Sequence, residues 1–283
     1  MFLTRRLLIL FLLPAGLLLF MFLLVPAVWS MGQSFTNFTL LGPDALSLKW
    51  LGFENYRRAL HDPAFWKSFR VSVIYVAGSA LVGQVVVGML LALLTQGGSG
   101  AVLRVLAVMA WIVPGVVVAI LWNVYLHGDD GTLNRVLGMV GISGPNWLMD
   151  RPLLAIVVFN TWRGAAFSML LFDAALRSIP ASYLEAAAVS GASPWRGFWD
   201  VTFPLLRPQL VTDLILITLW TFNDFGPYLL TGGGPGQQTE VLPIYTWRTA
   251  FRSFELGYGA ALSTILLAVN FVLAVGYQRM LKR

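Results

Sequence analysis

Six long apolar segments constrain the fold of this chain more than any other feature. A helix needs about 20 mostly apolar residues to cross the hydrocarbon core of a bilayer. Six stretches meet that length, and they cover about residues 7–30, 70–95, 103–126, 152–176, 208–230 and 258–279. Of the 283 residues, 58% are hydrophobic and only 11% are charged. The sequence therefore predicts an all-α, polytopic membrane protein with six transmembrane helices, in a single domain over residues 1–283.

An even number of spans places both ends of the chain on the same side of the membrane. Both ends carry basic residues without nearby acids, and cytoplasmic segments are enriched in Lys and Arg. These residues are Arg5, Arg6, Arg279, Lys282 and Arg283. The loops on the opposite side hold both basic and acidic residues, so the orientation depends mainly on the termini. We expect both termini, and with them the polar segment 177–207, to lie in the cytoplasm.

The composition also excludes several classes of function. The chain has no cysteine, so it can form no disulfide, thiol nucleophile or thiolate metal site. His61 and His127 are single histidines without a second ligand at metal spacing. The sequence contains no Gly-x-x-x-x-Gly-Lys-Ser/Thr motif for binding ATP phosphates. We therefore expect no catalytic residue, no metal site and no cofactor in this chain, and its net charge of +6 forms no basic stripe for nucleic acid.

The polar segment 180–208 separates two apolar spans and predicts a short helix at its start. Ser182-x-x-Glu185 fits a capping box, in which two side chains satisfy free backbone N–H groups at a helix start. Gly191 is expected to end this helix, because glycine adopts the left-handed conformation without a steric cost. Taken alone, these residues need do no more than start and stop a local helix.

A second short helix is predicted in the same segment. Ser193-Pro194 fits an N-cap followed by proline at the first helical position. Pro204 and Pro208 are expected to force a bend before the next span, because proline lacks the backbone N–H that a helix interior uses.

This segment resembles the Glu-Ala-Ala loop of permease subunits of ABC importers. The matching residues are Glu185-Ala186-Ala187, Gly191 and Val201-x-Phe203-Pro204, whereas Ser190 stands where the family often has Asp. The resemblance implies that Glu185, Ala186, Ala187, Gly191 and Pro204 dock on an ATPase subunit. It also implies the permease fold of type I ABC importers.

The resemblance extends over about residues 7–283. It includes Trp50–Tyr56, Asn160–Gly164, Trp220–Phe225 and Leu229–Gly236, and the stretch from Asp224 to Thr231 is one residue shorter than the usual pattern. These motifs resemble the carbohydrate branch of the family (maltose and glycerol-3-phosphate type), in particular the larger permease of the maltose type. The implied protein is a transmembrane subunit of an ATP-driven, binding-protein-dependent sugar importer in a bacterial plasma (inner) membrane.

The same resemblance implies the partners. They are a second permease subunit of a different sequence, two ATP-binding subunits that hold ATP and Mg²⁺, and an extracytoplasmic sugar-binding protein. The carbohydrate itself is not specified by the sequence.

Polar side chains inside spans are energetically costly, so each is a candidate for function. Arg163 and Asp224 are both expected in the outer half of the membrane, where they either pair with each other or line a wet cavity. Sugars are bound by planar polar groups together with aromatic rings. The candidate residues of the substrate path are Trp220, Thr221, Asn223, Asp224, Asn160, Arg163, Trp122 and Asn123. For Asn160 and Asn123 a hydrogen bond between helices is an equally good interpretation.

Two other classes of membrane protein compete with the importer subunit. A secondary transporter driven by an ion gradient would show inverted repeats and broken helices at the midplane, and neither is evident in the sequence. A membrane-embedded enzyme would need a metal cluster or a nucleophile–base set inside a span. Co-purification with an ATPase would separate the importer subunit from both.

Overall fold

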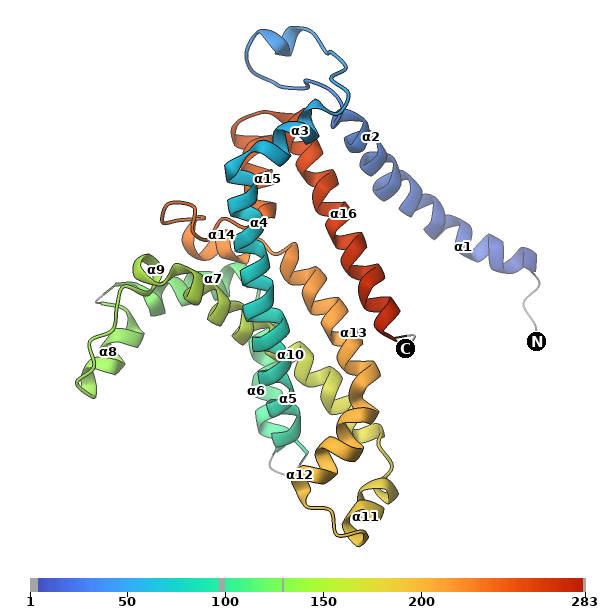
Figure 1. Cartoon of the computed structure of the whole chain (residues 1–283), viewed down its shortest axis with the longest axis vertical. Helices are drawn as coiled ribbons and strands as arrows, with labels where there is room; N and C mark the ends of the chain where they lie inside the picture. Colours follow the sequence, from blue (N-terminus) through green and yellow to red (C-terminus); the bar gives the residue numbers. More distant parts are fainter. Residues whose placement is uncertain (1–4, 97–99, 129, 282–283) are drawn as a thin grey trace. The chain divides into compact units, whose positions relative to one another are not determined.

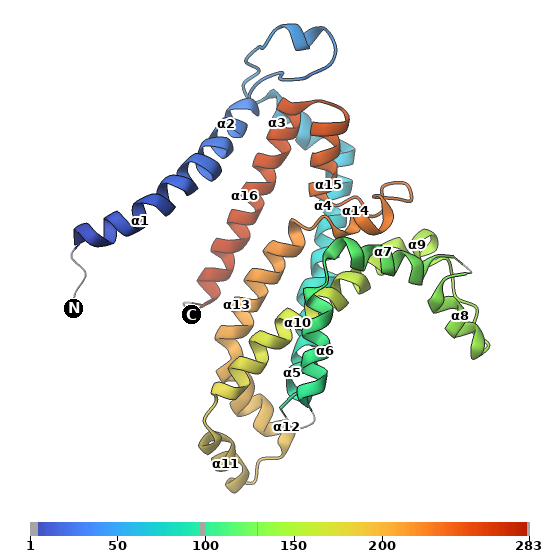
Figure 2. The same cartoon turned by 180° about the vertical axis from the view of Figure 1, so that it is seen from behind.

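The computed structural model describes residues 5–96, 100–128 and 130–281 (Figures 1 and 2). Lys282 and Arg283, and the side chains of Arg5 and Arg6, lie outside the described residues. The chain divides into two compact units. Unit 1 comprises Met1–Phe65 and Tyr245–Ala268, and unit 2 comprises Trp66–Ile244 and Val269–Arg283.

Five continuous helical runs are long and apolar enough to cross a membrane, and one bent pair of helices adds a sixth candidate. The continuous runs are Leu10–Gln33, Pro63–Leu94, Pro152–Ser178, Pro194–Phe222 and Leu256–Arg279. Each overlaps one predicted span, and the bent pair overlaps the predicted span 103–126. The expectation of an all-α polytopic protein is confirmed for the described residues.

Unit 1 holds the first membrane-crossing run and the segments that follow it. Its elements are α1 (Arg5–Leu19), η1 (Phe20–Leu24), α2 (Val25–Gln33), η2 (Pro43–Leu46), α3 (Glu54–His61), the start of α4 (Pro63–Tyr75), the end of α15 (Leu242–Trp247), η5 (Arg248–Arg252) and the first part of α16 (Leu256–Leu281). The run Leu10–Gln33 buries none of its apolar window against this chain. Its surface therefore needs lipid or another subunit as cover.

Unit 2 holds the remaining helices. They are the rest of α4, η3 (Val76–Gln84), α5 (Val85–Leu94), α6 (Gly100–Ile112), α7 (Gly115–Leu126), α8 (Thr132–Met139), α9 (Trp147–Asp150), α10 (Pro152–Ser178), α11 (Ala181–Val189), α12 (Pro194–Gly197), η4 (Phe198–Thr202), α13 (Phe203–Phe222) and α14 (Gly226–Thr231), with the start of α15 and the last part of α16. Helix α10 packs against η3, α5, α6 and α13 and so forms the centre of this unit.

The predicted span 103–126 is not one uninterrupted helix. Helices α6 and α7 meet at an angle of 101°. The break falls at Val113-Pro114, and Pro114 has an extended backbone with φ −54° and ψ 132°. Proline lacks an N–H to donate and disfavours the helical conformation of the residue before it, which explains the break.

The helix that leads into the predicted span 208–230 is continuous. A single helical run extends from Pro194 to Phe222, so neither Pro204 nor Pro208 ends the helix. Pro204 lies directly after the π-helical turn η4, and Pro208 lies inside α13. The helix then stops eight residues before the predicted end, and α14 is a separate short helix.

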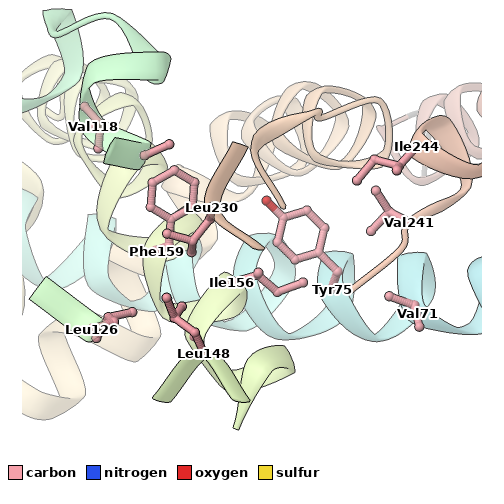
Figure 3. Packing of buried hydrophobic residues seen from close by; sticks show 12 residues of the cluster. Val71, Tyr75, Val118, Leu126, Leu148, Ile156, Phe159, Leu230, Val241 and Ile244 are labelled. Carbon is pink, nitrogen blue, oxygen red and sulfur yellow. The ribbon is translucent and has the colours of Figure 1, made fainter. Parts of the chain in front are cut away.

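A cluster of buried apolar side chains holds helices α4, α7, α10 and α14 of unit 2 together (Figure 3). Tyr75, Ile156 and Phe159 are fully buried, and Leu230 is 1% exposed. Figure 3 shows the Tyr75 ring among these side chains with its hydroxyl oxygen at one end of the ring. This hydroxyl is the link between the apolar cluster and the polar residues described below.

In unit 1 a single aspartate connects the start of α4 to α15 and α16. The dipeptide Asp62-Pro63 predicts an N-cap followed by the first helical residue. The structure confirms this, because Asp62 Oδ1 accepts a hydrogen bond from the Ala64 N–H at 2.8 Å and α4 begins at Pro63. Asp62 Oδ2 accepts hydrogen bonds from the hydroxyls of Tyr245 and, at 3.0 Å, Tyr258.

Candidate functional site

The first helix of the polar loop, α11, starts two residues earlier than the capping box requires. Pro180 is its N-cap, with an extended backbone at φ −60° and ψ 133° and no side-chain cap. The Tyr183 N–H donates to the Pro180 carbonyl at 3.1 Å. Ser182 therefore lies inside the first turn, and the predicted capping box of Ser182 and Glu185 is wrong. Proline at 180 ends the preceding extended segment and fixes the helix start instead.

The C-terminal end of α11 is as predicted. Gly191 has a φ of +78°. Its N–H donates to the Ala188 carbonyl at 3.0 Å, and the Ala192 N–H donates to the Ala187 carbonyl at 3.0 Å. These two bonds form a Schellman motif, which satisfies carbonyls that the helix end would otherwise leave free. Helix termination by Gly191 is confirmed.

The start of the second helix is also confirmed. Ser193 Oγ accepts a hydrogen bond from the Arg196 N–H at 3.4 Å, and Pro194 occupies the first helical position. The two short helices α11 and α12 thus exist, with α12 continuing into the span.

Helix α11 presents its side chains to the outside of the chain. Glu185, Ala186 and Pro204 are exposed and Ala187 is half-buried. Both views place α11 at the end of unit 2 where α5 ends and α6 begins (Figures 1 and 2). Large apolar side chains accompany it, with Trp195 71% exposed and Tyr183 54% exposed. A surface that combines exposed aromatic rings with a small-residue helix is suited to docking another protein.

The second group of predicted residues meets at Asp224. Arg163 Nη2 donates to Asp224 Oδ1 at 2.9 Å, and the Tyr75 hydroxyl donates to Oδ2 at 2.7 Å. The side chains of Arg163 and Asp224 are 27% and 11% exposed. We call these three residues the Asp224 triad. Of the two alternatives for Arg163 and Asp224, the structure has the ion pair.

The position of Asp224 differs from the prediction. Helix α13 ends at Phe222, so Asn223 and Asp224 lie in the turn that leads to α14 rather than on the helix with Trp220 and Thr221. The Asp224 N–H donates to the Thr221 carbonyl at 3.1 Å, as expected for a turn. The helix stops here because Gly226-Pro227 starts a new one, with proline in its first turn.

The buried side chain of Asn160 forms hydrogen bonds to neighbouring helices. Its Nδ2 donates to Ser79 Oγ at 2.8 Å and to Thr221 Oγ1 at 3.2 Å. Gln84 Nε2 donates to the Asn160 carbonyl at 3.3 Å. Asn160 is 2% exposed and Thr221 3% exposed. These contacts join η3, α10 and α13, which fits the hydrogen bonding between helices that was the alternative for Asn160.

Asn123 and Trp122 tie α7 to its neighbours. Asn123 Nδ2 donates to the Leu230 carbonyl at 3.0 Å. The Trp122 ring lies 5.8 Å from the rings of both Phe159 and Trp162, measured between centroids. Asn123 thus also forms a bond between helices, from α7 to α14.

Trp220 is a predicted path residue whose side chain is exposed on the surface of this chain. It is 54% exposed, and its ring lies 4.7 Å from that of Phe167, which in turn lies 5.9 Å from Trp111. Asn223 is exposed as well and exchanges hydrogen bonds with Asn270 at 3.0 and 3.2 Å. The aromatic neighbours of Trp220 were missed by sequence reasoning, although Phe167 follows Arg163 by one helical turn on α10 and so shares its face.

Tyr75 was also missed. It lies in a predicted span and is fully buried. A tyrosine hydroxyl in such a place needs a polar partner. The sequence offered that signal, but nothing in it indicated that the partner would be Asp224, 149 positions away.

Comparison with known proteins gives one consistent family. Residues 84–283 match the family described as binding-protein-dependent transport system inner membrane component. The chain is 32% identical to the sulfoquinovosyl glycerol transport system permease protein SmoG of Agrobacterium fabrum, over 98% of this chain and 91% of that protein. It is 34% identical to the trehalose/maltose transport system permease protein MalF of Thermococcus litoralis, over 79% of this chain and 78% of that protein.

The fold has a solved counterpart. A chain of the bacterial alginate ABC transporter, crystallised in complex with alginate pentasaccharide-bound periplasmic protein, superposes with a TM-score of 0.82. The match covers 97% of this chain and 93% of that one at 19% identity, so it is a likeness of fold.

Proposed function

The chain belongs to the family of binding-protein-dependent transport system inner membrane components, and we propose that it forms one half of the translocation path of a carbohydrate importer. As a member of this family it is a multi-pass, non-enzymatic permease subunit of an ABC importer in the inner membrane. The alternative of an ion-driven secondary transporter is not favoured, because the chain matches the importer permeases over most of its length.

The observation that carries the proposal is the exposed helix α11, closed at Gly191 and carrying Glu185 at one end of unit 2. We infer that α11 docks in a cleft of an ATP-binding subunit. Glu185 supplies a charge for a basic group there, Ala186 and Ala187 allow close approach, and Gly191 and Pro204 fix the ends of the docking segment. ATP and Mg²⁺ are bound by two such subunits.

This docking fixes the orientation that we propose. The loop 177–207 faces the cytoplasm, where ATP is available, and an even number of spans then leaves both termini on the cytoplasmic side. A second permease subunit of a different sequence completes the translocation path. It, or lipid, covers the apolar surface of the run Leu10–Gln33, which this chain leaves exposed.

A carbohydrate is the substrate class that fits best. Relatives named for sulfoquinovosyl glycerol and for trehalose and maltose support this choice. Trp220 offers an exposed ring for the apolar face of a sugar, with Asn223 and Asp224 close to it in sequence. Each oxygen of Asp224 already accepts one hydrogen bond, so a sugar hydroxyl either adds a second bond to one of them or displaces Arg163 or Tyr75. Asn160, Thr221, Trp122 and Asn123 hold the walls of this path. An extracytoplasmic binding protein delivers the sugar.

Charge reversal at Glu185 tests the proposal. The complex is purified from cells through a tag on this chain, and retained ATP-binding subunit and uptake of labelled disaccharides into liposomes are measured. Glu185→Lys should remove uptake and weaken retention of the ATP-binding subunit, while the yield of the chain in the membrane stays unchanged. Glu54→Lys is the matched control, because Glu54 is exposed and makes only a surface pair with Arg57. Full uptake by the Glu185→Lys complex would refute docking through α11.

A further inference from the structure

A cluster of five polar residues lies at the α11 end of unit 2. Asp173, in the last turns of α10, has a side chain that is only 9% exposed. Its Oδ1 accepts hydrogen bonds from Gln96 Nε2 at 2.9 Å, Arg104 Nη2 at 3.2 Å and Thr95 Oγ1 at 3.3 Å. Its Oδ2 accepts from Arg177 Nε at 3.0 Å. One carboxylate thus collects four donors, and we call these residues the Asp173 cluster.

The same cluster includes the C-terminal end of helix α5. Thr95 is the C-cap of α5, and its carbonyl accepts hydrogen bonds from Arg104 Nη2 at 3.1 Å and from Arg177 Nη2 at 3.4 Å. The carbonyl end of a helix attracts cations. A β-carbon on Gly100, the first residue of α6, would lie 2.4 Å from the Thr95 Cα, so the two helix ends are in direct contact. The cluster therefore fastens the ends of α5, α6 and α10 to one another.

Only two residues separate α10, which carries Asp173 and Arg177 of this cluster, from the docking helix α11. Helix α10 ends at Ser178 and α11 begins at Ala181. Ile179 and Pro180 between them are extended, with ψ values of 120° and 133°. Proline also fixes its own φ, which makes the connection short and stiff. A displacement of α11 therefore reaches the end of α10 first.

We propose that Asp173 is a positioning residue for energy coupling, which makes the ends of α5, α6 and α10 move as one body with α11. This inference rests on the proposed docking of α11. Without the carboxylate, two guanidinium groups converge on the single carbonyl of Thr95 and repel each other. The end of α10 then separates from α5 and α6, and a movement of α11 is absorbed locally instead of reaching the spans.

The test measures ATP hydrolysed per solute imported, in liposomes holding the whole importer with its binding protein and a labelled disaccharide that the unchanged complex imports. Asp173→Asn should keep the complex assembled and raise this ratio by roughly threefold or more, as expected for a residue within one network. Asp173→Glu should restore most of the coupling, because it returns the charge. The matched control is Asp213→Asn: Asp213 is a second buried aspartate, but its hydrogen-bond donor is Ser168 at 3.0 Å rather than an arginine.

The outcomes separate this inference from the proposed function. An unchanged ratio in Asp173→Asn, or an equal rise in Asp213→Asn, overturns the role of Asp173. If Glu185→Lys still abolishes uptake in that case, docking through α11 stands. If the Asp173→Asn complex fails to assemble, a second variant takes its place. The double change Arg104→Gln with Arg177→Gln removes both cations, keeps the carboxylate and should raise the same ratio. An unchanged ratio in this double variant also overturns the inference.

Discussion

The two ends of unit 2 each hold an aspartate paired with arginine, with side chains only 11% exposed at Asp224 and 9% at Asp173. The two arrangements differ in a way that fits two different proposed tasks. Asp224 has one arginine and one tyrosine, one donor to each oxygen. Asp173 has two arginines, a threonine and a glutamine, and its arginines also share the Thr95 carbonyl. A charge with a single cation can exchange it for another partner, whereas a charge held by four donors cannot do so without losing several bonds together.

The backbone under each aspartate supports this difference. Asp173 lies within α10, where a side chain moves only with its helix. Asp224 lies in the turn after α13, where changes of a few backbone angles re-aim a side chain. Under the proposed function, we expect the Asp224 triad to open when a solute passes and the Asp173 cluster to stay closed and transmit movement.

The largest effect is expected from breaking the Asp224 triad. Asp224→Ala leaves Arg163 without its anion and should cost ~3 kcal/mol of stability, seen as lower yield of assembled complex and loss of uptake. The double change Asp224→Ala with Arg163→Ala should recover assembly but not uptake, and a double-mutant cycle on both readouts measures the coupling. Basal ATP hydrolysis of whatever complex assembles should remain.

A different outcome would redefine this end of the molecule. If Asp224→Ala assembles normally and loses uptake while Asp224→Asn keeps part of it, Asp224 acts on the sugar and the pair with Arg163 is secondary. Normal uptake together with normal assembly in Asp224→Ala would contradict both roles.

A smaller effect is expected at the docking helix that the Asp173 cluster serves. Gly191→Val forces a β-branched residue into φ +78°, at a cost of about 1–2 kcal/mol. No atom lies within 4 Å of a β-carbon placed there, so the cost comes from the backbone alone. Uptake should fall, with Gly191→Ala milder than Gly191→Val. Gly197→Val is the control, because Gly197 has equal space but a right-handed helical backbone, with φ −58° and ψ −37°. Equal uptake by the Gly191→Val and Gly197→Val complexes would show that the helix end does not matter for docking.

The smallest effect concerns Asp62, an aspartate outside the spans that serves as a reference for the two buried ones. Burial raises its pKa, but hydrogen bonds, first from Tyr245 and then from Ala64 and Tyr258, lower it below the ordinary 3.8. The stability that Asp62 contributes is therefore present above pH 3.8 and is lost as the pH falls through the lowered pKa. Tyr245→Phe should lower the melting temperature above pH 3.8 and much less below it.

Tyr245 gives a second check at alkaline pH. Burial, and then its bond to Asp62, raises the pKa of Tyr245 from 10.0 to about 12. The unfolded chain then loses this proton first, so the wild-type protein should lose stability between about pH 10 and 12, and the Tyr245→Phe protein should lack that contribution. Parallel melting curves of the two proteins at all pH values would contradict the assignment.

Local signals in the sequence predicted local features well. The positive φ of Gly191 and the cap at Ser193 follow from residues within one or two turns of each other, as does the start of α4 at Asp62-Pro63. The start of α11 was wrong because Pro180, rather than Ser182, precedes the first helical turn. Pro114 is itself a local signal for the break between α6 and α7. The prediction of one span over 103–126 followed the length of the apolar run instead.

The polar clusters could be predicted only in part, because they depend on contacts between distant segments. Arg163 and Asp224 could be named as a pair from their depth in two spans, but the sequence did not choose between pairing and a cavity. The Asp173 cluster brings Thr95, Gln96 and Arg104 to a residue about 70 to 80 positions later. Composition and periodicity do not predict contacts between such distant residues. The contacts form because α5 and α6 pack against α10.

The most direct measurement compares the two ends of unit 2 in one assay. Complexes carrying Asp224→Asn or Asp173→Asn are reconstituted side by side, and uptake and ATP hydrolysis are recorded with and without the binding protein. We predict that Asp224→Asn lowers uptake and stimulated hydrolysis together, so that ATP used per solute stays constant. Asp173→Asn should lower uptake while hydrolysis continues, so that this ratio rises. The same change of ratio in both complexes would contradict the division of tasks between the two aspartates.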